Sequence, residues 1–185
     1  YMHRTRRIYD IHLADFMREW LGGCGQFPVV PGEHVKLTDN EVLAAIVSAA
    51  HEPDTRLGVL AGRIVERDKR FGLLYELTPA HRSLNADAAR RIAEAARDRY
   101  EPDAVRLDSY DPKQDPFDFP VQTRSREIAS STQLSDVLAR VPTTRFQRVY
   151  LDCQDLEDAK RWLEGQMESL IAPREEPEGD YQIER

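Results

Sequence analysis

The sequence predicts an α+β fold, in which a mostly α-helical N-terminal half is followed by a small α+β lobe with a short antiparallel or mixed sheet. In the first hundred residues, apolar side chains recur every three or four positions, which is the helical period. After that the period changes, because Val105 and Leu107 alternate with polar residues in the manner of a half-buried strand. We therefore expect a helical region over 1–100, an α+β lobe over 101–172, and an acidic, flexible tail over 173–185.

The helices of the first half are indicated by their end signals. The first runs from the start of the chain to about Gly22, where glycine suits a left-handed cap, and a loop rich in Gly and Pro follows over 24–37. Thr38-Asp39-Asn40-Glu41 has the pattern of a capping box, which opens a helix to about Ala50. Two more helices are expected: one capped by Asp54 with an apolar face from Leu57 to Tyr75, and an alanine-rich one over 85–100.

The second half alternates short strands with short helices. The run RVYLDC is the clearest strand, and Pro120 marks another as an edge strand. Ser130-Ser131 precedes a helical stripe, so an N-cap explains this pair better than a nucleophile. The expected strands are 104–110, 117–122, 127–130 and 148–153, and the expected helices are 134–141 and 156–170.

Composition bounds the class of protein. The chain has 185 residues, with 26 basic and 33 acidic side chains and a net charge of −7. The acidity lies at the C-terminal end and the body is nearly neutral, which argues against general nucleic-acid binding. No apolar run is long enough for a membrane span.

Cys24 and Cys153 do not form a secreted disulfide framework, so we expect buried, reduced thiols and a cytoplasmic protein. A helical pattern that starts at Tyr1 without a cap indicates a fragment of a longer protein.

The usual catalytic and metal motifs are missing. The five histidines show no HExxH spacing, so we expect exposed or hydrogen-bonded histidines rather than metal ligands. The run GGCG follows a helix rather than a strand, which is the wrong context for a dinucleotide loop. No catalytic residue and no cofactor are therefore expected within this chain.

Arginines form the most suggestive pattern. Arg63, Arg67 and Arg70 stand at i, i+4 and i+7 and would share one face of the third helix, where guanidinium groups can clamp a phosphate. The alternative is a solvated face that Glu66 and Asp68 neutralise. Arg4 belongs to a second basic cluster at the start of the chain.

Several segments, read in order, resemble one known family. These are YMHRTRRIYDIHLADFMREWL, GQFP, LTDNEVLAAIVSAA and RIVERDKRFGLLYEL, followed later by RVY. They are similar to the C-terminal region of bacterial HD-domain phosphohydrolases of the dNTP triphosphohydrolase-like family. The matching elements are Tyr1, His3 and Arg4, then Arg70 and Tyr75, then Arg148, Val149 and Tyr150.

The resemblance implies a function for the parent protein. It would be a cytoplasmic, homo-oligomeric hydrolase of a dNTP-like nucleotide that uses a divalent metal, with no membrane or nucleic-acid partner. The family's His-Asp metal site is absent, since no His-Asp dipeptide occurs here, so its ligands would lie upstream and this fragment alone would be inactive. By resemblance Tyr1 would lie at the substrate rim, and Arg4, Arg63, Arg67 and Arg70 are the candidates for phosphate or allosteric contacts. The alternative is a non-catalytic protein-interaction or oligomerisation module.

Overall fold

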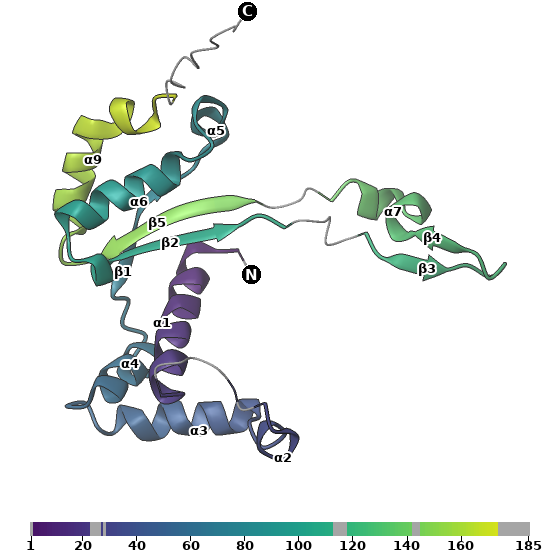
Figure 1. The fold of residues 1–185 in the computed structure, drawn as a ribbon, viewed down its shortest axis with the longest axis horizontal. Coiled ribbons are helices and arrows are strands. Elements are labelled where there is room, and N and C mark those ends of the chain that lie inside the picture. The colour runs from purple at the N-terminus through teal and green to yellow at the C-terminus, as the bar shows by residue number, and fades with distance from the viewer. Residues whose placement is uncertain (1, 23–26, 28, 113–117, 142–144, 174–185) are drawn as a thin grey trace, which may run out of the picture. The chain divides into compact units, whose positions relative to one another are not determined.

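The computed structural model describes residues 2–22, 27, 29–112, 118–141 and 145–173. It confirms the α+β class (Figure 1). The helices are α1 (Arg4–Trp20), α2 (Pro31–His34), α3 (Asp39–Ala50), α4 (Arg56–Val65), α5 (Pro79–Leu84), α6 (Ala88–Arg99), the 3-10 turn η1 (Pro102–Ala104), α7 (Ser131–Leu134), α8 (Asp136–Ala139) and α9 (Leu156–Ile171). The strands are β1 (Phe71–Glu76), β2 (Val105–Tyr110), β3 (Pro120–Gln122), β4 (Ile128–Ser130) and β5 (Phe146–Asp152). Except for Pro173, the expected tail lies outside the described residues.

The strands form two sheets. One has the order β1-β5-β2, and the other is the antiparallel hairpin β3-β4, in which Val121 lies opposite Ala129. Two hydrogen bonds, from Leu77 N to Gln147 O and from Cys153 N to Arg70 O, flank β1 and show that it runs antiparallel to β5. The strands expected at 104–110, 127–130 and 148–153 are confirmed to within two residues.

The chain divides into two compact units. Unit 1 comprises Tyr1–Leu73 with Leu151–Lys160, and unit 2 comprises Leu74–Tyr150 with Arg161–Arg185. Within the described ranges, no helix combines the length and apolar character that crossing a membrane requires.

Unit 1 has its core among α1, α3 and α4 (Figure 1). Phe16, Ile46 and Ala61 are buried there, one from each helix, because each helix has an apolar stripe at a spacing of three or four residues. The predicted capping box is present at the start of α3, where Thr38 and Glu41 each satisfy the other's backbone N–H. In α4, Gly58 allows a close approach of the backbone, since a Cβ there would lie 1.9 Å from the Glu52 carbonyl oxygen.

In unit 2, the buried face of α6 consists mainly of alanines. The small side chains of α6 let it approach its neighbours closely, and Ile92 is fully buried among them. The Arg91 guanidinium donates to the carbonyl oxygens of Ser169 and Ala172, at 3.1 and 2.7 Å, so it caps the end of α9. Tyr100 after α6 also contacts Trp162 of α9 edge to face.

The helix expected over 54–75 is wrong in its second half. α4 ends at Val65, and β1 begins at Phe71. The intervening residues include only charged side chains from Glu66 to Arg70, and Arg67 has a left-handed backbone with φ of 56°, which no helix continues through. Pairing with β5 then fixes the following residues as a strand.

One smaller correction and one confirmation concern helix ends. The single helix expected over 134–141 is two short helices, because Ser135 leaves the helical conformation and its hydroxyl caps α8 by accepting from Leu138 N. Ser130 caps α7 by accepting from Thr132 N, which confirms the N-cap interpretation of the serine pair.

Candidate functional site

A cationic cavity lies in unit 1 where the end of α4 and the loop before β1 approach the end of β5. Its volume is about 390 Å³. The loop supplies two cations and a carboxylate, and the last residue of β5 and the turn after it supply the rest of the lining apart from Arg63. The lining residues are Arg63, Asp68, Lys69, Arg70, Asp152, Cys153 and Gln154.

Arg70 is held in a fixed position. Its Nε donates to Asp152 Oδ2 at 2.7 Å, its guanidinium carbon lies 5.1 Å from the Phe71 ring centroid, and its carbonyl accepts from Cys153 N. Burial alone would raise the pKa of Asp152, but hydrogen bonds from Arg70 and the Gln154 amide, together with nearby positive charge, lower it. Asp152 is therefore an ionised anchor that orients Arg70.

Arg63 is different, because its half-buried guanidinium has no hydrogen-bond or ion-pair partner among the described residues. Burial and then the charge of Arg70 lower the pKa of Arg63, and the negative charges of Asp15, Asp152 and Asp68 offset this only in part. With Lys69, the part of the cavity lining that the structure describes carries three cations against two carboxylates. An anion bound here would relieve the repulsion between Arg63 and Arg70.

A buried histidine lies close to this charge. His12 of α1 is fully buried, and neither ring nitrogen has a hydrogen-bond partner among the described residues. Its ring stacks on Phe71 at 5.6 Å and meets Tyr9 edge to face at 5.9 Å. Burial, followed by the charge of Arg63, lowers the pKa of His12 to about 4, so the ring is neutral at pH 7. The expectation of exposed or hydrogen-bonded histidines is wrong for His12, because burial of a residue on an amphipathic helix depends on its distant neighbours.

Of the sequence-predicted contact residues, the structure brings together only Arg63 and Arg70. Arg67 is exposed and does not line the cavity, since its left-handed backbone turns the chain and its carbonyl accepts from the Tyr9 hydroxyl at 2.8 Å. Arg4 is exposed at the start of α1, and Tyr1 lies outside the described residues. The shared helical face does not exist, because α4 ends before Arg67.

The sequence does not predict that Asp152 and Cys153 lie beside these arginines, nor that Lys69 shares their cavity. The order of residues in β5 and the following turn gave no signal for this proximity. Cys153 was expected to be buried but is exposed, because β5 ends one residue earlier. Its Sγ donates to the Lys69 carbonyl oxygen at 3.4 Å, and burial of the sulfur followed by the charge of Asp152 raises its pKa.

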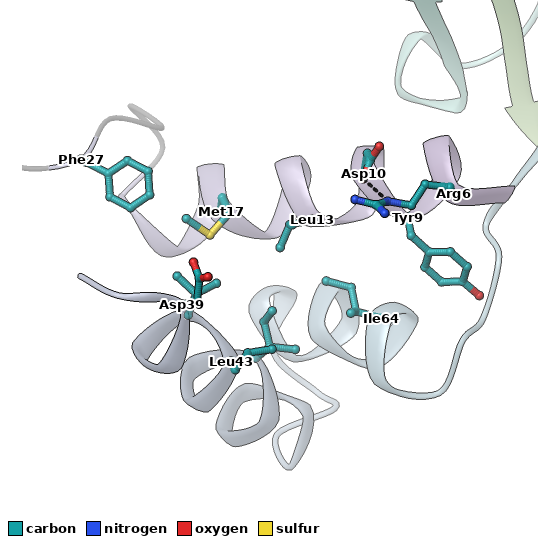
Figure 2. Close-up of a pocket in the computed structure, with 11 residues that line it drawn as sticks. Arg6, Tyr9, Asp10, Leu13, Met17, Phe27, Asp39, Leu43 and Ile64 are labelled. Carbon is teal, nitrogen blue, oxygen red and sulfur yellow. Dashed lines mark hydrogen bonds and ion pairs between the residues drawn. The ribbon is translucent and has the colours of Figure 1, made fainter. Parts of the chain in front are cut away.

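A second, apolar cavity in unit 1 forms a groove of about 550 Å³ between α1 and α3. Figure 2 shows Leu13 of α1 and Leu43 of α3 on facing sides of this groove, with Ile64 on the neighbouring helix α4. Leu13 and Leu43 are 39% and 59% exposed, so apolar surface faces solvent here. Asp39 lies on the rim at the first turn of α3.

The described residues contain no group of three or more His, Cys, Asp or Glu side chains that is able to hold a metal ion. The residues present therefore do not fit a metal centre, and the cationic cavity, which carries excess positive charge, would repel a divalent cation.

Neither protein-family models nor curated proteins match this chain. Among solved structures, it is similar to a hypothetical protein from Aquifex aeolicus, with 20% sequence identity and a TM-score of 0.57. The match covers 88% of this chain and 40% of that one, so this chain spans less than half of the neighbour's length. At this identity, the likeness shows that the two chains share a fold.

Proposed function

We propose that this chain is a C-terminal accessory region of a metal-dependent HD-type nucleotide phosphohydrolase. It provides substrate-rim, allosteric or oligomerisation surface and leaves the metal chemistry to the rest of the parent protein. The observation that carries the proposal is the cationic cavity, in which the unpaired Arg63 faces the anchored Arg70. The order of the family-like segments along the chain supports it.

The cavity is suited to the phosphate of a regulatory nucleotide. Arg70 is pre-oriented by Asp152, so little side-chain entropy is lost when an anion binds to it. The guanidinium N–H groups of Arg63 have no partner among the described residues and are available to an anion, and the Lys69 ammonium adds a compact positive charge to the cavity lining. Asp68 lies on the same rim and would disfavour ligands whose negative charge extends beyond the two arginines.

The remaining assignments rest on the resemblance. Tyr1 would contact the substrate at the rim of the parent's nucleotide pocket, since a tyrosine combines a flat apolar face with a hydroxyl. The divalent metal belongs to the parent, and no step of its chemistry is assigned to residues of this chain. The parent would be a cytoplasmic homo-oligomer.

The test uses the parent protein with Arg63 and Arg70 both changed to Ala. Charge-assisted bonds contribute about 1.5–3 kcal/mol each, so the double variant should lose nucleotide-dependent activation or assembly by at least about tenfold. Arg90→Ala is the matched control, because Arg90 is an exposed arginine on α6 whose ion pair with Asp87 is 3.9 Å long. If activation and sedimentation of the double variant match those of the control, the cavity is a solvated surface and the proposal is wrong.

The apolar groove favours a second candidate, a non-catalytic protein-interaction or oligomerisation module. The exposed Leu13 and Leu43 would seat an amphipathic helix. Leu43→Glu places a charge on this surface at an exposed position, so the chain should still fold. Loss of assembly in Leu43→Glu, together with normal assembly in the double arginine variant, would support the module instead of the nucleotide site.

A further inference from the structure

A second charged cavity lies in unit 2, at the place where β2 ends, β5 begins and α5 passes into α6. Its volume is about 230 Å³. Arg82 and Arg145 supply positive charge, and Asp111 supplies one carboxylate. Tyr110 comes from β2, Phe146 and Gln147 come from β5, and Ala86 lies between α5 and α6. All of these residues belong to unit 2, so the cavity is separate from the cationic cavity of unit 1.

The two arginines are available to a ligand in different ways. Arg82 is half-buried, and its guanidinium has no hydrogen-bond or ion-pair partner among the described residues. Arg145 donates from Nε to Asp111 at 3.2 Å, but these side chains are 53% and 68% exposed. An exposed ion pair of this kind contributes little free energy, so an incoming anion can replace Asp111 at modest cost. Among the described residues that line it, the cavity has two guanidinium groups against one carboxylate.

The opposite wall is aromatic and rigid. Phe146 is 4% exposed, its ring stacks on Tyr110 at 6.0 Å with an interplanar angle of 22°, and the Arg148 guanidinium lies 4.4 Å from its centroid. Two hydrogen-bond contacts of 2.8 and 2.9 Å from the Arg148 guanidinium to Glu76 Oε1 hold that arginine in place. Tyr110 is half-buried and lines the cavity, so it offers ring surface and a hydroxyl to a ligand.

We propose that this cavity binds a small phosphomonoester, with its phosphate on Arg82 and Arg145 and its organic part against Tyr110. Guanidinium groups bind phosphate oxygens in pairs, and the net positive charge favours a dianion. A volume of about 230 Å³ is below the usual range for drug-sized ligands, which limits the organic part to about one ring. Tyr110 should favour an aromatic ester over an aliphatic one.

The test is calorimetric titration of the 185-residue chain with phenyl phosphate, glycerol phosphate and inorganic phosphate at constant ionic strength. Phenyl phosphate should bind at least threefold more tightly than glycerol phosphate, and Tyr110→Leu should remove this preference. Arg82→Gln should weaken every phosphate at least tenfold, whereas the exposed control Arg90→Gln should not. Arg63→Ala should leave this binding unchanged, which separates it from the proposed nucleotide site.

Other outcomes overturn the proposal. Equal weakening by Arg82→Gln and Arg90→Gln would show diffuse charge attraction rather than a site. No heat with any phosphate at millimolar concentration would show that the cavity takes no phosphate. Tighter binding of inorganic phosphate than of both esters would contradict the role of Tyr110. If Arg82→Gln does not fold, as judged by thermal unfolding, Arg145→Gln provides the same comparison from an exposed position.

Discussion

Lowering the pH from 7.5 to 5 should destabilise unit 1 through His12. Its ring is neutral and buried in the folded chain, with a pKa of about 4, against 6.5 for an exposed histidine. Protonation therefore favours the unfolded state, and the stabilisation is complete above pH 6.5 and is lost as the pH falls toward 4. The difference of the two pKa values corresponds to about 3 kcal/mol in full, of which about 2 kcal/mol is lost by pH 5.

The assay is urea unfolding detected by Trp20 fluorescence. Trp20 packs against the core of unit 1, and Trp162, the second tryptophan, is replaced by Phe so that only Trp20 reports. His12→Phe keeps an aromatic ring beside Phe71 but cannot be protonated. Between pH 7.5 and 5, the free energy of unfolding of His12→Phe should fall by about 2 kcal/mol less than that of the same chain with His12.

The control for this experiment is His51→Gln, which changes an exposed histidine at the end of α3. Its free energy of unfolding should depend on pH in the same way as that of the chain with His12 and His51 intact. The reasoning is refuted if the free energy of unfolding falls equally in His12→Phe and in the chain with His12 over this pH range, because His12 would then have the same pKa in the folded and unfolded chain.

Three further outcomes are expected. Leu163→Ala should cost about 2–5 kcal/mol in urea unfolding, because Leu163 is 3% exposed and its removal leaves a cavity; an unchanged midpoint would mean that α9 is not packed there. Gly58→Ala should cost at least about 1–3 kcal/mol, since its Cβ would overlap the Glu52 carbonyl oxygen, whereas Gly62→Ala, with open space around it, should not destabilise. The chain alone should have no phosphohydrolase activity, and its calorimetric titrations with manganese and nickel should be flat. A stoichiometric metal site with micromolar affinity would contradict this.

Local signals in the sequence were sufficient for much of the fold. The Thr38–Glu41 capping box, the alternation in β2 and the apolar run of β5 each depend on neighbouring residues, and the structure has them within two residues of the expected positions. The prediction of a helix from Glu66 to Tyr75 is wrong because Phe71 and Tyr75 continue a helical spacing, while the strand partner lies more than 70 residues later.

The site was harder to predict than the fold. The sequence predicts that Arg63 and Arg70 share a helical face, which does not exist. They line one cavity for a different reason, because Arg70 pairs with Asp152, which is 82 residues away in the chain. No local pattern contains such a pairing. The neutrality of His12 was equally hidden, because it depends on Phe71, Tyr9 and the arginines that surround it.

The raised pKa of Cys153 has a consequence for redox chemistry. Peroxide and disulfides react with thiolates rather than with thiols, and a thiol next to Asp152 that donates to the Lys69 carbonyl remains protonated at neutral pH. Although it is exposed, the sulfur should therefore be oxidised slowly to sulfenic acid and exchange slowly with glutathione disulfide. The wall of the cationic cavity would then keep its charge balance during oxidative stress, without an added negative group beside Arg70.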